Sequence, residues 1–137
     1  MKAKIYNFKS HAKINLSLNV ISKKKLNKLH SIESLVTLID LADEIRIEEN
    51  NSKNHKVVFI GKFSRGISKV NTITRLLNLM DKKKFLKKKY NFLIKKNIPQ
   101  QSGMGGGSMN AATVLNFFRK QKILSKKQTL YFAQEIG

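Results

Sequence analysis

A glycine-rich segment offers the clearest chemistry in this chain of 137 residues. It reads PQQSGMGGGSMNAA over residues 99–112 and holds four of the seven glycines, namely Gly103, Gly105, Gly106 and Gly107. Glycines let backbone N–H groups approach a ligand closely, and a helix that follows directs its positive end at the same point. The segment therefore fits a phosphate-binding loop, although a strand–helix connection packed closely on a sheet has the same composition.

Two familiar phosphate loops do not match this segment. A P-loop needs a lysine after its last glycine, and Ser108 stands there instead. A dinucleotide-binding loop needs glycine at the position of Ser108 and an acid about twenty residues later. No carboxylate occurs between Asp81 and Glu135. This excludes a dinucleotide-binding loop, but it also means that no carboxylate nearby in the sequence would repel a bound phosphate. Ser108 is either a helix cap or a hydroxyl that contacts a phosphate or a metal ion.

The strand expected upstream carries a second candidate group. HAKINLSLNV, residues 11–20, alternates strictly between apolar and polar residues, which predicts a half-buried strand. Its predicted core face consists of Ala12, Ile14, Leu16, Leu18 and Val20. The other face presents Lys13 beside Asn15, a cation next to an amide. A lysine on a polar face is commonly only a solvated charge, and a polar connection is expected over 22–29.

The remaining pattern predicts one α+β domain over residues 1–137, with a mainly antiparallel sheet. Further strands are predicted at 31–39, 44–49, 55–60 and 90–96. Helices are predicted at 71–88, 108–120 and 126–136. A turn is expected at Asp40–Asp43, Pro99 ends the last strand, and Asn71 and Ser125 are the expected N-caps.

The composition is strongly basic, with 28 Lys and Arg against 8 Asp and Glu, a net charge of +20. One explanation is a nucleic-acid or acidic-membrane partner. The other is an AT-rich genome, which enriches Lys, Asn and Ile together and leaves room for a polyanionic small molecule. The chain has no cysteine, its three histidines show no metal-ligand spacing, and neither a membrane span nor a secretory signal is apparent. A cytoplasmic protein is expected.

Three segments together resemble the GHMP small-molecule kinases. Residues 99–112 resemble that family's P-x-x-x-G-[LM]-G-G-G-S-x-N-A-A loop, and SHAKINLSLNV resembles its A-K-[IL]-N-L strand. ESLVTLIDLADEIRIE is similar to its [QS]-x-[FV]-x-x-[IL]-D-x-x-D-x-[IL] segment. The resemblance implies a fold like ribosomal protein S5 domain 2, with ATP and Mg²⁺ as cofactors. It is closest to the members that phosphorylate the 2-hydroxyl of a cytidine diphosphate-linked methylerythritol, a small-molecule substrate of isoprenoid synthesis.

The resemblance also implies roles for particular residues. The lysine of the A-K-[IL]-N element is catalytic in the family and corresponds to Lys13, with Asn15 holding the methylerythritol end. Asn71 resembles an asparagine near the nucleotide, although it is equally an ordinary N-cap. Ser108 is the implied Mg²⁺ contact. The residues implied to bind ATP are Asn71, Pro99, Gly103, Met104, Gly105, Gly106, Gly107 and Ser108.

Two departures from the family pattern stand out. His30 corresponds to a family histidine that holds the cytidine ring, but the G-Y before it has become Lys28–Leu29, which removes a stacking face. The family's general base, an aspartate in an L-G-A-D-x-P element, is expected just beyond Gly137. The chain is therefore expected to be a truncated N-terminal, ATP-binding domain without its C-terminal domain.

Other functions remain open from the sequence. Another GHMP kinase, for homoserine, mevalonate or a sugar, is the nearer alternative. A basic RNA- or ribosome-associated module is the more distant one, although arginine is scarce and the aromatic residues fall mostly at predicted core positions. The kinase interpretation expects no nucleic-acid or membrane partner and is compatible with a homodimer.

Overall fold

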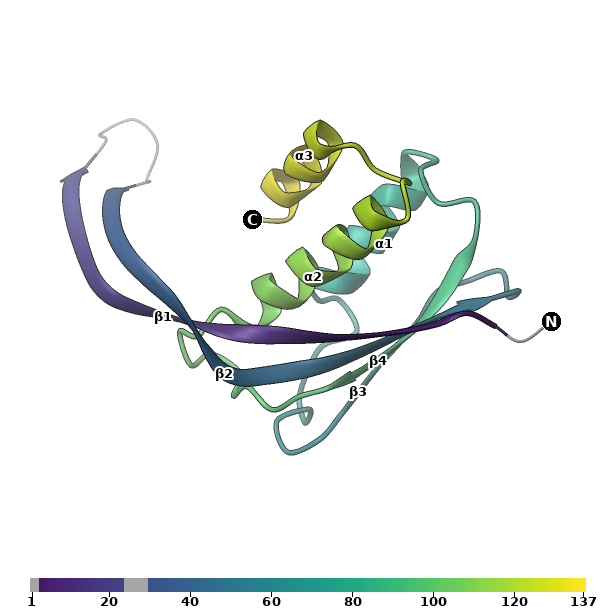
Figure 1. Cartoon of the computed structure of the whole chain (residues 1–137), viewed down its shortest axis with the longest axis horizontal. Helices are drawn as coiled ribbons and strands as arrows, with labels where there is room; N and C mark the ends of the chain where they lie inside the picture. The colour runs from purple at the N-terminus through teal and green to yellow at the C-terminus, as the bar shows by residue number, and fades with distance from the viewer. Residues whose placement is uncertain (1–2, 24–29) are drawn as a thin grey trace.

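The computed structural model describes residues 3–23 and 30–137. Its four strands are β1 (Ile5–Lys23), β2 (His30–Asn50), β3 (Lys56–Ile60) and β4 (Lys89–Lys95). Its three helices are α1 (Thr72–Lys82), α2 (Gly106–Lys120) and α3 (Lys126–Ile136). The helices lie on one face of the sheet (Figure 1). None of the helices in the described ranges is long and apolar enough to cross a membrane.

The sheet has the order β1–β2–β4–β3 and is mainly antiparallel, as predicted. β2 pairs antiparallel with both β1 and β4, and only β3 and β4 are parallel. The core lies between this sheet and the helices. Its largest fully buried side chains include Ile45, Ile47, Phe92, Ile94, Leu76, Leu77, Phe117, Phe118 and Phe132. The alternation of β4 and the apolar faces of α1 and α2 therefore direct these residues inward, as the sequence pattern indicated.

The predicted buried face of residues 11–20 is wrong beyond Ala12. Ala12 is fully buried, but Leu16, Leu18 and Val20 are 54–60% exposed. β4 pairs only with the end of β2, from Glu44 onward, so the earlier part of β2 and the later part of β1 form a two-stranded ribbon. This ribbon extends past the helices and bends toward the side of the sheet on which they lie (Figure 1). Nothing in the described ranges packs over that ribbon deeply enough to bury its apolar residues.

A bulge in β1 also changes which residues share a face. The register slips between Asn15 and Ser17, where an extra β1 residue enters the pairing. Asn15 is paired with Val36 and Leu18 with Ser34, so both β1 residues lie on the same face as these alternate β2 residues. The face that carries Lys13 and Asn15 therefore continues into apolar residues, contrary to the strict alternation expected.

The turn expected at Asp40–Asp43 is also wrong, because β2 runs through it without a break. His11 pairs with Ala42 and Lys13 with Leu38, so three β2 residues lie opposite Ala12. The extra residues are accommodated as a bulge instead of a chain reversal. Asp43, expected in a turn, is fully buried.

The helix boundaries differ from the prediction at two places. α1 ends at Lys82 and not at residue 88, because Lys84 adopts a left-handed conformation (φ 61°) and the Phe85 N–H donates to Met80 O at 3.0 Å. α2 begins at Gly106, two residues before the predicted start at Ser108.

Three predicted elements and both predicted N-caps are confirmed. The strand predicted at 55–60 begins one residue later, the strand predicted at 90–96 lies one residue earlier, and helix 126–136 has the predicted bounds. Asn71 and Ser125 are N-caps, each within a capping box. Of the polar connection predicted over 22–29, the first two residues belong to β1, and the rest lies outside the described residues.

Candidate phosphate-binding site

The start of α2 presents unpaired backbone donors. Its N-cap, Gly105, is left-handed (φ 68°) and provides no side-chain cap. The first amide of this turn with a backbone acceptor is Met109, which donates to Gly105 O at 2.8 Å. Within the described residues, the N–H groups of Gly106, Gly107 and Ser108 have no acceptor. Because these donors lie at the positive end of a helix of 15 residues, the arrangement favours an anion.

A cleft with a volume of about 390 Å³ adjoins these donors. The residues that line it include Asn71, Thr72, Lys96, Pro99, Gly103, Gly105, Gly106, Gly107, Ser108 and Asn110. Thr72 Oγ1 donates to Gly107 O at 3.1 Å, which ties the start of α1 to the start of α2. The structure thus places Asn71 at the same cleft as the glycine loop. Ser108 is not the cap of α2, and its exposed side chain lines the cleft.

Lys13 lies against the glycine loop although it is distant from the loop in sequence. Its backbone N–H donates to Met104 O at 3.0 Å. Its Cε atom lies 3.7 Å from the position that a Cβ on Gly105 would occupy. β1 is an edge strand of the sheet, so its free backbone donor can pair with the loop. The cation predicted from the strand and the loop predicted from its glycines therefore meet.

The other two predicted substrate contacts lie further along the ribbon. Asn15 follows Lys13 on the same face and accepts a hydrogen bond from Ser34 Oγ at 3.2 Å. His30 starts β2 opposite Lys23, ten residues along β1 from Lys13. At the usual rise of a strand this is roughly 30 Å of ribbon. The described structure does not bring His30 to the glycine loop.

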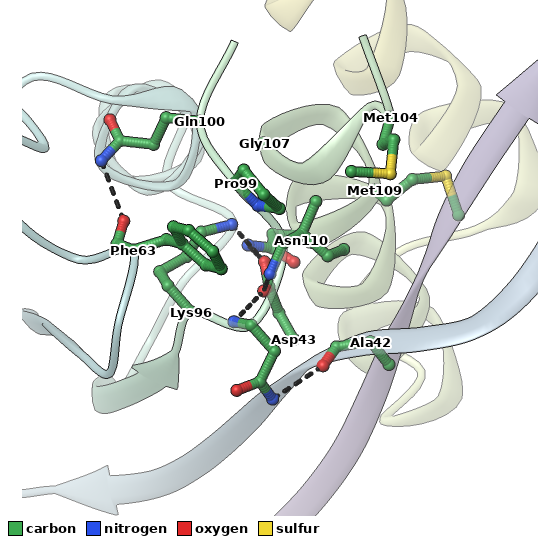
Figure 2. Close-up of polar contacts among 12 residues, drawn as sticks. Ala42, Asp43, Phe63, Lys96, Pro99, Gln100, Met104, Gly107, Met109 and Asn110 are labelled. Carbon is green, nitrogen blue, oxygen red and sulfur yellow. Dashed lines mark hydrogen bonds and ion pairs between the residues drawn. The ribbon is translucent and has the colours of Figure 1, made fainter. Parts of the chain in front are cut away.

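A buried ion pair under the loop escaped the sequence analysis (Figure 2). Lys96 is 4% exposed and Asp43 is fully buried, and Lys96 Nζ pairs with Asp43 Oδ2. Asn110 Nδ2 donates to the same oxygen at 2.9 Å. Lys96 Nζ lies 3.2 Å from where a Cβ on Gly106 would be, so glycine is needed there for close approach. An ammonium group therefore lies directly beneath the first turn of α2.

A signal for this lysine was present in the sequence. Tyr90, Phe92 and Ile94 alternate on the core side of β4, and all three are buried. Lys96 is the next position of the same alternation, so it continues a core face as a charged residue. A buried lysine is rare unless it is paired. A search for its partner among the carboxylates of neighbouring strands is the step that could have found Asp43.

A second polar cluster lies in a neighbouring cavity of about 470 Å³, which shares Phe59, Ile67 and Asn71 with the cleft. Its His55 Nδ1 accepts from the Tyr90 N–H at 3.1 Å, and Nε2 lies 3.2 Å from Asp81 Oδ2. Burial lowers the pKa of His55, an effect that the nearby Asp81 partly opposes. Burial, with a smaller effect from Glu49, raises the pKa of Tyr90 to about 12. His55 is therefore neutral at neutral pH.

The cleft is unlike a preformed metal centre. Among the residues described, no three His, Cys, Asp or Glu side chains cluster in a way that could hold an ion. No carboxylate lines the cleft, and the nearby Asp43 is already occupied by its donors. The exposed side-chain hydroxyl of Ser108 lies at the start of α2. The geometry fits a ligand that brings its own negative charge.

Comparison with known proteins agrees with this geometry. Residues 71–137, which include α1, the glycine loop, α2 and α3, match the family model of the GHMP kinases N terminal domain. The mixed α+β fold and the relatives described next agree with that match. The chain belongs to the GHMP kinase family.

The relatives narrow the comparison to one kind of kinase. The 4-diphosphocytidyl-2-C-methyl-D-erythritol kinase of Pelagibacter ubique (strain HTCC1062) is 53% identical over 135 residues, covering 96% of this chain and 47% of that protein. The protein of the same name from Fervidobacterium nodosum (strain ATCC 35602 / DSM 5306 / Rt17-B1) is 34% identical over 129 residues, covering 94% and 44%. A crystal structure of 4-(cytidine 5'-diphospho)-2C-methyl-D-erythritol kinase matches with a TM-score of 0.75 and 26% identity, covering 96% and 46%. The chain thus spans about half the length of the curated relatives it matches.

Proposed function

We propose that this chain is the ATP-binding half of a kinase that phosphorylates the 2-hydroxyl of 4-diphosphocytidyl-2-C-methyl-D-erythritol, in the cytoplasm. The observation that carries the proposal is the contact between Lys13 and a glycine loop whose helix presents three unpaired N–H groups. The names of the relatives point to this acceptor rather than to homoserine, mevalonate or a sugar. The product serves the synthesis of isoprenoid precursors.

Phosphoryl transfer depends mainly on positioning and on neutralising the charge of the moving group. In this proposal the N–H groups of Gly106, Gly107 and Ser108 bind ATP phosphates at the end of the cleft. The Lys13 ammonium reaches the transferred phosphoryl group and the acceptor oxygen from the strand side of the loop. Asn15, on the same face of β1, holds the methylerythritol end of the substrate.

The remainder of the loop keeps these groups in place. Pro99 O accepts from Ser102 Oγ at 2.9 Å, which closes the turn that leads into the left-handed Gly103 (φ 73°). The carbonyl of Met104 holds Lys13. The neighbouring cavity, which meets the cleft at Asn71, has room for the nucleoside of ATP. The Ser108 hydroxyl would help hold the Mg²⁺ that accompanies ATP, and the metal would supply further charge neutralisation.

We also propose that a C-terminal half like that of the longer relatives completes the enzyme. The ribbon exposes apolar residues that include Leu18, Val20, Ile32 and Leu38, each 54–60% exposed, on the Lys13 face. Such a contiguous apolar surface is typical of an interface. In the completed enzyme the second half covers this surface, contributes the aspartate that accepts the hydroxyl proton, and brings the cytidine to His30.

The proposal is tested with the second half of the Pelagibacter ubique relative, which is joined in frame after Gly137. The expected result is ATP-dependent formation of the 2-phosphate product. Phosphorus NMR of the substrate and product monitors the reaction. The same fusion carrying Lys13→Met is the matched control and is expected to bind ATP but to turn over more slowly by about 100-fold or more. A stable fusion that binds ATP and phosphorylates homoserine but not the cytidine-linked substrate would show that the acceptor is wrong.

A further inference from the structure

We propose that Asp43 is a positioning residue, which holds the Lys96 ammonium beneath the phosphate-binding turn of α2. Asp43 is fully buried on β2 and does not line the cleft, whereas its partners Lys96 and Asn110 both do. It therefore acts on a ligand only indirectly, through the groups that it holds. The inference rests on the proposed function for the identity of the ligand, but its geometry is independent of that identity.

The two carboxylate oxygens of Asp43 accept hydrogen bonds from different groups (Figure 2). Oδ1 accepts from the backbone N–H groups of Asn97 and Ile98, at 2.8 and 2.9 Å, and so holds the chain as it enters the loop. Oδ2 accepts from Lys96 Nζ and from Asn110 Nδ2. Asn110 lies on α2, just after the loop. One carboxylate therefore joins both ends of the glycine loop.

The position of Lys96 explains why such a carboxylate is needed. An ammonium group near the positive end of a helix is unfavourable when it is alone. Asp43 balances that charge and fixes where it lies, within 3.2 Å of the Cβ position on Gly106. A buried ion pair is weak evidence for stability by itself, because desolvation offsets much of the attraction. Its placement at the cleft points to a role in ligand binding.

Asp43→Asn separates the two sets of hydrogen bonds, because it keeps the size and shape of the side chain. The amide oxygen can still accept from Asn97 and Ile98, but the amide nitrogen now faces Lys96 and Asn110, which are also donors. We expect the Kd of Mg-ATP to rise at least tenfold. Glu44→Gln is the matched control, because Glu44 is the next β2 residue, is exposed and pairs with Lys95.

A double-mutant cycle shows whether Asp43 acts through Lys96. In a Lys96→Met background, adding Asp43→Asn is expected to change the ATP Kd by less than twofold. An equal loss of affinity in both backgrounds would overturn the inference, and so would wild-type affinity in folded Asp43→Asn protein. If Asp43→Asn does not fold, Asp43→Glu replaces it. That variant keeps the charge but displaces it by one methylene, so positioning predicts weakened binding and charge balance alone predicts none.

A nucleotide-free measurement separates this inference from the proposed function. Amide NMR shifts of Gly106, Gly107 and Ser108 are expected to change in Asp43→Glu and to stay unchanged in Glu44→Gln. If the wild-type chain binds no ATP while these shifts respond, the proposed function fails and the positioning role stands. Unchanged loop shifts in folded Asp43→Glu would overturn the positioning role, whether or not ATP binds.

Discussion

The backbone N–H of Lys13 donates to the carbonyl of Met104 at 3.0 Å, joining the edge strand of the sheet to the glycine loop. This bond is made by the main chain, so it does not depend on the lysine side chain. The side chain lies over Gly105, whose hypothetical Cβ would be 3.9 Å from Lys13 Cβ. The site can therefore lose the Lys13 ammonium while the contact between strand and loop persists.

Replacement of Lys13 by methionine is accordingly expected to affect chemistry and not folding. In the completed enzyme we expect the turnover number to fall by about 100-fold or more, the usual loss when a charge-stabilising group is removed. The free energy of unfolding is expected to change by less than about 1 kcal/mol. Coupled-assay kinetics and urea unfolding measure the two effects. Lys9→Met, on the same strand, is the control, and equal turnover in both variants would remove Lys13 from the mechanism.

Gly106→Ala and Gly107→Ala form a matched pair of neighbouring substitutions. A Cβ on Gly106 would lie 3.2 Å from both Ile98 Cγ2 and Lys96 Nζ, closer than ordinary packing allows. A Cβ on Gly107 would meet Thr72 Oγ1 at an ordinary 3.6 Å. We expect Gly106→Ala to destabilise by about 1–3 kcal/mol. Gly107→Ala is expected to be neutral or to stabilise by up to about 1 kcal/mol. Thermal unfolding of both proteins checks the order, and the reverse order would refute the close approach at Gly106.

The sequence predicted most of the elements that surround this site because their signals are local. Asn71 and Ser125 predict the starts of two helices. The alternation of Tyr90, Phe92 and Ile94 predicts a strand with one buried face. The glycine loop and Lys13 were also found as separate candidates. Their contact was expected only from the family resemblance, because no local pattern says which edge of a sheet a loop will meet.

The failures of sequence prediction arose where neighbouring elements decide the outcome. Leu18 and Val20 were expected in the core, but the bulge after Asn15 turns them to the Lys13 face, where no helix of residues 3–23 and 30–137 buries them. Asp43 was expected in a turn, yet it is buried and accepts hydrogen bonds from three residues that follow β4 and from one residue of α2. These donors come from residues more than fifty positions later, so composition near Asp43 does not reveal them.

His55 predicts a dependence of stability on pH. Burial lowers the pKa of His55 in the folded protein below its ordinary value of 6.5. The unfolded chain therefore takes up the proton first as the pH falls, and this contribution to stability is full above pH 6.5 and is lost below it. We expect the free energy of unfolding to fall between about pH 7 and pH 5, and His55→Gln to reduce that slope. Urea unfolding at several pH values checks this, and identical slopes in the two proteins would contradict it.

A left-handed lysine follows the C-cap of each of two helices, and its replacement by glycine is expected to stabilise the protein. Lys84 and Lys122 adopt left-handed conformations, with φ of 61° and 58°, directly after the C-caps of α1 and α2. Glycine adopts this conformation without the steric cost that a side chain carries. We expect Lys84→Gly to stabilise by about 0.5–1 kcal/mol, measured by chemical unfolding. Lys82→Gly, inside α1, is expected to destabilise by a similar amount. A loss of stability in Lys84→Gly would mean that α1 does not end as described.

Calorimetric titration of Mg-ATP into the 137-residue chain tests most directly whether the start of α2 binds the phosphates of ATP. We expect saturable one-to-one binding that weakens at least tenfold in folded Gly106→Ala protein and is not displaced by single-stranded RNA. Binding of equal affinity in Gly106→Ala, or binding that RNA displaces, would contradict it and favour a general polyanion surface. The absence of any ATP binding by the folded chain would contradict it equally.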